Sequence, residues 1–381
     1  MNFELTETQT LIRDTARKIS RERIAPGARE RDRNERFPRE LYTELAQLGL
    51  LGVNIPAQYG GAEAGVVSYA LAMMEVSAAC ASTAVGMAVT NMCAELIYKF
   101  GTEAQREKYL PRLTSGEAIV GAFALSEPHA GSDPGAMHTT AKRRGNSWVI
   151  NGSKQWITSG AHAGVMVVWA RTGGEGNRGL SAFIVEGGTK GLLVGKHEDK
   201  MGLRASNTVG LTFEDCEIPL ENLLGKEGEG FKLAMIALDG GRIGIASQAC
   251  GVGRAALDSA VRYSKERKAF GQAIAEFQGL RFMMADMAVQ LRAAELLTYR
   301  AAVLKEQGAP FSREASMAKL FASETSNRVC DKAVQILGGY GYIDEFPVER
   351  YLRDARVQTI YEGTSEVQRI VIARETIKLL G

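Results

Sequence analysis

The chain has 381 residues, enough for two or three domains and for a core that needs no disulfide or structural metal. Hydrophobic residues make up 45% of it and charged residues 24%, which excludes general disorder, collagen-like repeats and low-complexity arrays. Lys and Arg together number 46 and Asp and Glu 44, so the formal net charge is +2. That balance lacks the charge excess that binds nucleic acid or an anionic membrane surface.

Residues 1–120 are predicted to form an N-terminal α-helical domain. Apolar side chains recur there every three or four positions, as on one face of a helix, at Leu5, Leu11, Ile12, Ala16 and Ile19. A second run of this kind ends before Gly49. Residues 66–100 are rich in Ala and Met and poor in charges, so we expect a largely buried helical segment.

Residues 121–230 are predicted to form an antiparallel β-domain. Short strand-like runs alternate with Gly and Asn turns at 119–125, 148–150, 165–170, 182–185, 192–194 and 208–213. The glycines of 174–179 match the spacing GxGxxG, which in a dinucleotide-binding site opens a helix. A strand-like run follows here instead, so we expect a hairpin loop.

Residues 231–381 return to a helical pattern. Amphipathic segments at 276–306, 312–337 and 364–379, with a helix that begins near Met235, predict a four-helix bundle. The small residues of 251–256 lie inside this pattern and favour close helix packing. The predicted fold class is therefore α+β, with a helical N-terminal domain, an antiparallel middle domain and a C-terminal helical bundle.

The five cysteines are scattered, and none has a neighbour at metal-ligand spacing. This pattern is typical of reduced thiols in a cytosol-like compartment, and it predicts no metal. The N-terminus has no readable leader, and no apolar run is as long as a membrane helix. We therefore expect a cytoplasmic protein of bacterial type.

Two stretches of the predicted β-domain have the residue types of a ligand site. Residues 123–133 (FALSEPHAGSD) offer the hydroxyls of Ser126 and Ser132 beside a glycine that allows close backbone approach. Residues 148–158 include a turn predicted at Asn151-Gly152, followed by Trp156 and a Thr. Trp156 is either a core residue of an ordinary hairpin or an indole beside an aromatic cofactor.

Three further stretches lie in the C-terminal region. Residues 267–272 (RKAFGQ) supply a guanidinium and a Phe, and residues 335–341 (QILGGYG) form a glycine-rich helix exit. Residues 361–369 (YEGTSEVQR) place Glu362 before a flexible glycine and a helix start. Ser365 with Gln368 fits a capping box, although Thr364 could equally be the cap. Each stretch alone is also compatible with an exposed turn or helix end.

Together and in this order, the motifs FALSEPHAGSD, NGSKQWIT, ERKAFGQ, QILGGYGY and YEGTSEVQR resemble the acyl-CoA dehydrogenase family. The resemblance extends from Leu5 to about Leu380. It is strongest to the short-chain members, which act on butyryl-CoA or on small branched acyl groups. Family members that carry the catalytic base on another helix lack the glutamate before Gly-Thr, and this chain keeps it at Glu362.

The resemblance implies non-covalent FAD and oxidation of a short-chain acyl-CoA to the trans-2-enoyl-CoA, as in fatty acid β-oxidation or branched-chain amino acid degradation. It implies that Glu362 removes the α-proton, that the β-hydride goes to flavin N5, and that electrons pass to electron-transfer flavoprotein. A carboxylate suits this role if burial raises its pKa and if hydrogen bonds stabilise the developing enolate.

The resemblance also assigns roles to individual residues. The cofactor contacts that it implies are Phe123, Leu125, Ser126, Ser132, Trp156, Ile157, Thr158, Arg267, Phe270, Gln278, Gln335, Ile336, Gly338, Gly339, Thr364 and Glu366. The implied substrate contacts are Ser132, Asp239, Arg242 and Gly363. Residues 267–278 and 335–339 would reach the FAD of a neighbouring subunit, in a homotetramer built as a dimer of dimers. The acyl pocket floor is expected near Met92 and Leu96.

Alternatives remain open. Gly240-Gly241 replaces the Met-Gly pair of many butyryl enzymes and also occurs in relatives for small branched chains, so a branched substrate is the second hypothesis. A flavin oxidase or monooxygenase on the same fold is the third. A non-catalytic relative is disfavoured because the glutamate is present.

Overall fold

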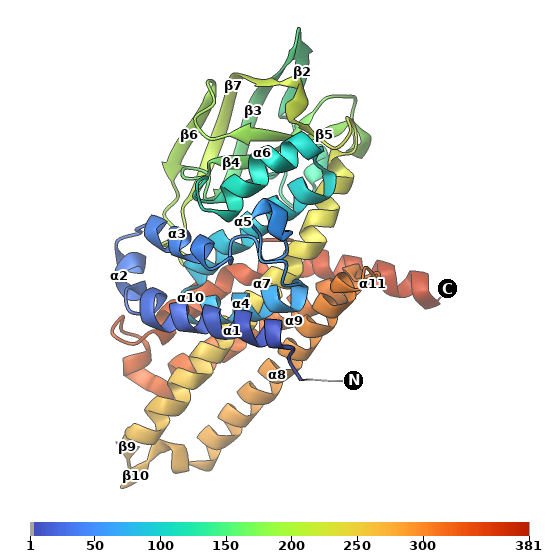
Figure 1. The fold of residues 1–381 in the computed structure, drawn as a ribbon. Coiled ribbons are helices and arrows are strands. Elements are labelled where there is room, and N and C mark those ends of the chain that lie inside the picture. The colour runs from blue at the N-terminus through green and yellow to red at the C-terminus, as the bar shows by residue number, and fades with distance from the viewer. Residues whose placement is uncertain (1–3, 381) are drawn as a thin grey trace.

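A computed structural model describes residues 4–380. Residues 1–3 and 381, the outer ends of the predicted first and third domains, lie outside the described residues. Figure 1 shows the large β-sheet at one end of the molecule and a small β-ribbon at the opposite end. The long helix α7 runs between them. Within residues 4–380, no helix combines the length and apolarity needed to cross a bilayer.

Within residues 4–120 there are six α-helices, and two of them begin with a capping box. Thr6 and Thr102 each accept a hydrogen bond from the backbone N–H of the Gln three residues on, and the side chain of that Gln accepts one from the Thr N–H. The bounds are α1 (Glu7–Ile19), α2 (Ala28–Arg33), α3 (Arg39–Gln47), α4 (Val66–Ala79), α5 (Ala81–Phe100) and α6 (Glu103–Thr114). The prediction of buried helix over 66–100 is confirmed, with one break where Cys80 becomes extended.

The middle of the chain forms one sheet with the order β6-β7-β3-β2-β4-β5-β8, and β1 pairs with β4. Its strands are β1 (Gly121–Ala124), β2 (Thr140–Arg144), β3 (Ser147–Thr158), β4 (Val165–Arg171), β5 (Leu180–Glu186), β6 (Leu192–His197), β7 (Thr208–Pro219) and β8 (Leu223–Leu224). The loop at 174–179 joins antiparallel β4 and β5, as predicted.

The pairing departs from the antiparallel prediction at β1. This strand runs parallel to β4, and β2 adds one parallel pair with β4. A parallel pair needs a long connection, which the forty or so residues between β1 and β4 provide. Since sequence runs show strands and not their partners, this pairing was not readable from the pattern.

The predicted turn at Asn151-Gly152 is wrong. Strand β3 continues through it and pairs with β7 on both sides, with a register shift at Gly152. The Asn151 side chain exchanges two hydrogen bonds with Asp215 of β7, at 2.8 and 3.2 Å. The register shift is a β-bulge. A Cβ on Gly152 would lie 2.6 Å from the Thr139 Cα, so a residue without a side chain is needed at this position.

The C-terminal region forms the predicted bundle. Its elements are α7 (Gly230–Glu266), the ribbon β9 (Lys268–Ala269) and β10 (Gln272–Ala273), α8 (Gln278–Glu306), α9 (Ser312–Leu337), α10 (Val348–Arg356) and α11 (Ser365–Leu380). Helix α9 packs against α7, α8 and α11. Close packing at 251–256 is confirmed, because a Cβ on Gly251 would lie 2.3 Å from the Met74 carbonyl oxygen of α4.

Candidate active site

Glu362 lies on a strained turn before α11. It has a φ of +54° and is followed by Gly363 at +89°. A left-handed conformation is uncommon for a residue with a side chain, and such residues gather at functional sites. Thr364 ends the turn, because its Oγ1 accepts from the Val367 N–H at 3.3 Å. Thr364 is therefore the helix cap, and the alternative cap at Ser365 is wrong.

The Glu362 carboxyl group is enclosed by the protein. Its Oε2 is buried and has no hydrogen-bond partner within residues 4–380. Burial raises the pKa of Glu362 to about 7, against the opposing effect of the nearby Lys319 and Arg242 charges. A carboxyl group with this pKa can accept a proton near neutral pH.

Room for the carboxyl group comes from a glycine on α7. A Cβ on Gly241 would lie 2.7 Å from Glu362 Oε2 and 3.2 Å from the Met92 sulfur. Gly241, Met92 and Glu362 therefore meet at one point, which is where the pocket floor was expected. Leu96, the other expected floor residue, is buried one helical turn further along α5.

A buried ion pair holds the segment after β1 against β3. Lys154 Nζ donates to Glu127 Oε1 at 2.8 Å and to the Leu125 carbonyl at 3.1 Å. The Gln155 N–H donates to the Ser126 carbonyl at 2.9 Å. These contacts bring together the two predicted flavin stretches, although they lie about thirty residues apart in the chain.

Trp156 projects from this junction. Its φ is +62° and 61% of its surface is exposed, so of the two alternatives for Trp156 the core residue of a hairpin is wrong. The next residue, Ile157, is buried, and Thr158 is half-buried. An exposed indole held by a strained backbone beside a hydroxyl suits a flat aromatic ligand.

Strand β1, which leads into this junction, is linked to the Glu362 site through Cys93. Phe123 of β1 packs on Trp169, with 4.3 Å between ring centroids. The Cys93 thiol of α5 donates to the Ala122 carbonyl of β1 at 3.2 Å. Burial raises the pKa of Cys93, with a smaller contribution from the Glu362 charge. Ser132 is exposed in the following loop, where Gly131 has open space beside it.

A second group of predicted residues lines a cavity of about 480 Å³ at the far end of α7. The lining includes Arg267, Ile336, Gly338 and Gly339. The Arg267 guanidinium stacks over the Tyr340 ring at 5.9 Å and has no ion pair within the described residues. Both glycines have open space where a Cβ would be. A free cation, an aromatic ring and bare backbone suit a phosphate and a purine.

The remaining residues of this end are exposed. Phe270 has 97% of its surface exposed and a φ of +51° on the β9–β10 ribbon. Gln278 and Gln335 are also exposed. From Gly241 to Glu266, α7 rises about 37 Å, at roughly 1.5 Å per residue. The predicted cofactor residues thus form two separate groups, which one chain does not bring together.

The predicted substrate residues Asp239 and Arg242 pair with each other on α7. Ser312 donates to Asp239 at 3.0 Å, and the Arg242 guanidinium donates to the Ser316 hydroxyl at 3.2 Å. Arg242 is only 5% exposed and points into the bundle, where its charge lowers the pKa of Glu362. Glu366, by contrast, is exposed on α11.

Sequence reasoning missed Lys319. It is fully buried, and its ammonium group donates to the Gly363 carbonyl at 2.6 Å. The signal was present, because Lys319 shares the face of Ala315 and Ala322, which an amphipathic pattern marks as buried. A charged side chain on an otherwise buried helix face is a candidate functional residue.

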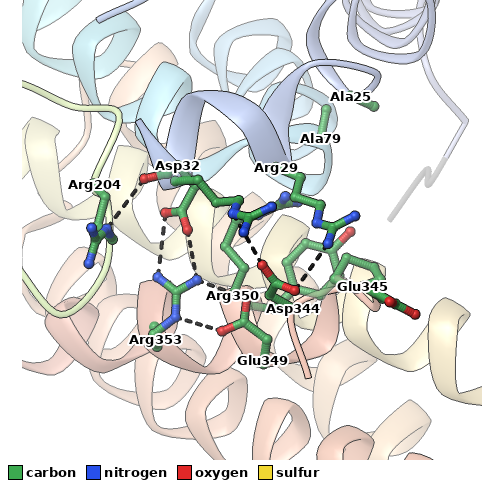
Figure 2. A pocket seen from close by; sticks show the side chains of 13 residues that line it. Ala25, Arg29, Asp32, Ala79, Arg204, Asp344, Glu345, Glu349, Arg350 and Arg353 are labelled. Atoms are coloured by element: carbon green, nitrogen blue, oxygen red, sulfur yellow. Dashed lines mark hydrogen bonds and ion pairs between the residues drawn. The ribbon is translucent and has the colours of Figure 1, made fainter. Parts of the chain in front are cut away.

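Another cavity, of about 630 Å³, lies between α2, α10 and the loop at Arg204 and contains none of the predicted site residues. Figure 2 shows how its charged groups pair with one another. Asp344 forms ion pairs with Arg29 and Arg33. Arg353 bridges Asp32 and Glu349. We interpret this network as structural, since it ties the N-terminal helices to α10.

Comparison with known proteins gives matches along the chain. Residues 6–117, 122–216 and 228–377 match the N-terminal, middle and C-terminal domains of acyl-CoA dehydrogenase. The mitochondrial short-chain specific acyl-CoA dehydrogenase of Mus musculus is 49% identical over 379 residues, 99% of this chain and 92% of the relative.

Solved structures agree. Butyryl-CoA dehydrogenase from Megasphaera elsdenii is 45% identical and has a TM-score of 0.97, over 99% of this chain and 100% of that chain. A chain from the structure of the electron transferring flavoprotein of Acidaminococcus fermentans is 49% identical and has a TM-score of 0.98, with the same coverage.

Proposed function

The chain belongs to the acyl-CoA dehydrogenase family, as an FAD-dependent short-chain acyl-CoA dehydrogenase, and we propose that Glu362 is its catalytic base. The observation that carries this proposal is the buried, unpartnered Oε2 of Glu362 on a strained turn. A carboxylate without a hydrogen-bond partner is costly to bury, and a reacting proton would give it one.

The reaction removes two hydrogens from neighbouring carbons. Glu362 accepts the α-proton as the α C–H bond breaks. When bound, FAD supplies the two-electron acceptor for the β-hydride, so that a C=C bond forms and the product is the trans-2-enoyl-CoA. The glycine at 241 leaves room for the Glu362 carboxyl group, whose Oε2 is buried from solvent.

The residues around the site fit FAD. We assign the flavin ring to the junction of β1 and β3, with Phe123, Leu125, Ser126, Trp156, Ile157 and Thr158. Trp156 offers an exposed indole face there, and Thr158 offers a hydroxyl. The N-terminus of α11 at Thr364 suits an anionic group.

We assign the adenine half of FAD to the cavity at Arg267, Gly338 and Gly339 of a second copy of the chain. About 37 Å of α7 separates Gly241, beside Glu362, from the end of the helix next to Arg267, so we propose that a partner chain completes the site. Helix α8 has an exposed apolar stripe at seven-residue spacing, formed by Phe282, Val289 and Leu296, which are 61%, 69% and 39% exposed. Such a stripe is suited to contact with a second chain. This sharing needs at least two chains, and we propose a homotetramer built as a dimer of dimers.

Electron-transfer flavoprotein is the acceptor that we propose. The support is that a chain 49% identical to this one was solved in a structure whose subject is such a flavoprotein. An acceptor requirement also separates a dehydrogenase from the oxidase hypothesis. An oxidase would form hydrogen peroxide steadily from acyl-CoA and oxygen.

The test is an anaerobic titration of the FAD-loaded enzyme, followed by the visible spectrum. Butyryl-CoA should bleach the oxidised flavin band more completely than isobutyryl-CoA. Bleaching by isobutyryl-CoA alone would support the branched hypothesis from Gly240-Gly241. No bleaching by either compound would reject the short-chain activity.

A variant tests the base. Glu362→Gln should keep FAD and acyl-CoA binding but lose turnover by about 100-fold or more, because the geometry survives and the base does not. Near wild-type turnover would move the base to another residue.

A further inference from the structure

A buried lysine contacts the turn that carries Glu362. Lys319 of α9 is 0% exposed, and its Nζ donates to the Gly363 carbonyl at 2.6 Å. Gln368 Nε2 donates to the same carbonyl at 2.9 Å and to the Glu362 carbonyl at 3.2 Å. Both carbonyl groups of the left-handed pair are therefore held by side chains. A strained turn persists only when its surroundings determine it in this way.

Lys319 differs from the other fully buried lysine. Lys154 has the carboxylate of Glu127 at 2.8 Å, which compensates for burying its charge. Lys319 forms no ion pair within residues 4–380, and burial lowers its pKa to about 8. The charge that favours its protonated form most is that of Glu362. The Lys319 ammonium group is therefore compensated only by the Gly363 carbonyl and, at longer range, by the Glu362 charge.

One face of α9 holds three parts of the site. Ser312 bonds to Asp239, Ser316 to Arg242, and Lys319 to Gly363. Residues spaced by four and three positions share a helix face. Helix α9 therefore fixes α7 and the Glu362 turn relative to each other, and Lys319 makes the contact at the turn.

We propose that Lys319 is a positioning residue for the base: its ammonium group holds the left-handed turn that presents the Glu362 carboxylate to the substrate. This inference rests on the proposed role of Glu362. The contact that Lys319 makes is with the Gly363 carbonyl, so we assign it no direct part in the reaction. Its effect passes through the Gly363 carbonyl and through its charge.

The charge has a second consequence. Glu362 is faced by Lys319 from α9, Arg242 from α7, Tyr69 from α4 and Cys93 from α5. Tyr361 precedes it, and burial raises the pKa of Tyr361, Tyr69 and Cys93, which keeps these three groups neutral. Lys319 and Arg242 are thus the two positive charges that lower the pKa of Glu362. Removing one of them should raise that pKa.

The experiment measures proton abstraction separately from hydride transfer. The FAD-loaded enzyme is mixed in D2O with 3-thiabutyryl-CoA, which has an α-proton but no β-hydrogen, and deuterium uptake is measured across pH. Lys319→Met should lower the exchange rate at pH 7 by about 10- to 100-fold through misplacement of the carboxylate. Its acidic limb should move up by about one pH unit. Lys319→Gln removes the charge but retains a donor, so it should show the pH shift with a smaller loss of rate.

Lys332→Met is the matched control, because Lys332 lies on the same helix but is exposed. It should behave as the wild type. Flavin content and melting temperature are measured for every variant. If Lys319→Met does not fold, Lys319→Gln provides the decisive pH profile.

An unchanged rate and an unchanged acidic limb in a folded Lys319 variant would overturn the proposal. A lower flavin content and a lower melting temperature, with the acidic limb of the pH profile unmoved, would also overturn it. That is the result expected of a merely structural lysine. Failure of the underlying function gives a different result, because Glu362→Gln would then still exchange deuterium.

Discussion

At the scale of single residues, the site concentrates unfavourable features at Glu362. The residue has a left-handed backbone, a buried oxygen without a partner and a raised pKa. Each of these costs folding free energy, and functional sites commonly retain such costs. The turn persists because Lys319 and Gln368 hold its two carbonyl groups.

The raised pKa predicts how stability depends on pH. Glu362 binds its proton more tightly in the folded protein, where its pKa is about 7, than in the unfolded chain, where a glutamate has its ordinary pKa of 4.5. Its contribution to stability is therefore full below pH 4.5 and is lost as the pH rises through 7. Glu362→Gln should be more stable than the wild type at pH 8, by about 3 kcal/mol, and much closer to it at pH 5.

Thermal unfolding of both proteins at the two pH values measures this difference. Equal melting temperatures at pH 8 would mean that the Glu362 carboxylate is better solvated than the fold indicates.

Trp156 allows a test of the flavin assignment. Because 61% of its surface is exposed, Trp156→Ala should leave the melting temperature of the FAD-free protein nearly unchanged. FAD affinity should fall by about tenfold or more, since an aromatic contact is lost. Fluorescence titration with FAD measures this. Leu11→Ala, which removes another exposed apolar side chain, should change neither quantity.

At the scale of elements, the site depends on close contact between helices. Helix α7 passes α4 at Gly251 and the Glu362 turn at Gly241, and both contacts need a missing side chain. Helix α9 supports α7 from the other side through Ser312 and Ser316. The base is therefore placed by the packing of three helices and not by its own loop alone.

Gly251→Ala should destabilise the protein, by about 1–3 kcal/mol, because its Cβ would lie 2.3 Å from a backbone oxygen that cannot move aside. Chemical denaturation measures this. Gly279→Ala is the matched control, since this helical glycine is exposed and has nothing within 4 Å of the new Cβ. It should leave stability unchanged or raise it slightly. Equal effects at the two positions would contradict the close contact of α4 and α7.

At the scale of the whole molecule, α7 separates the two groups of cofactor residues. One lies beside the β-sheet and the other beside the β9–β10 ribbon, at opposite ends of the view in Figure 1. The proposed site therefore needs a second chain, and cofactor retention and assembly should be coupled.

Arg267→Ala should weaken FAD retention and oligomer stability together. Light scattering and the flavin-to-protein ratio, measured during dilution, check this coupling. Val289→Glu places a charge on the exposed stripe of α8 and should lower the oligomeric state first, with loss of flavin as a consequence. Normal flavin content in Arg267→Ala would rule out the role assigned to Arg267.

Much of this protein was determined by local sequence. The order of helix, strand and helix follows from apolar periodicity, and the helix boundaries at 306, 312 and 337 agree with the structure. The motifs around Trp156 and Glu362 identified the family because they lie within short continuous stretches. Local physics is sufficient there, since capping, periodicity and turn residues act over a few positions.

Tertiary structure alone decided the remaining features. Parallel pairing of β1 with β4, the bulge at Gly152 and the inward direction of Arg242 all depend on partners that are distant in the chain. The contact between Lys319 and Gly363 joins residues more than forty positions apart. A sequence pattern reports which face of a helix is buried, but not which atom lies opposite. The chemistry of Glu362 depends on those opposite atoms.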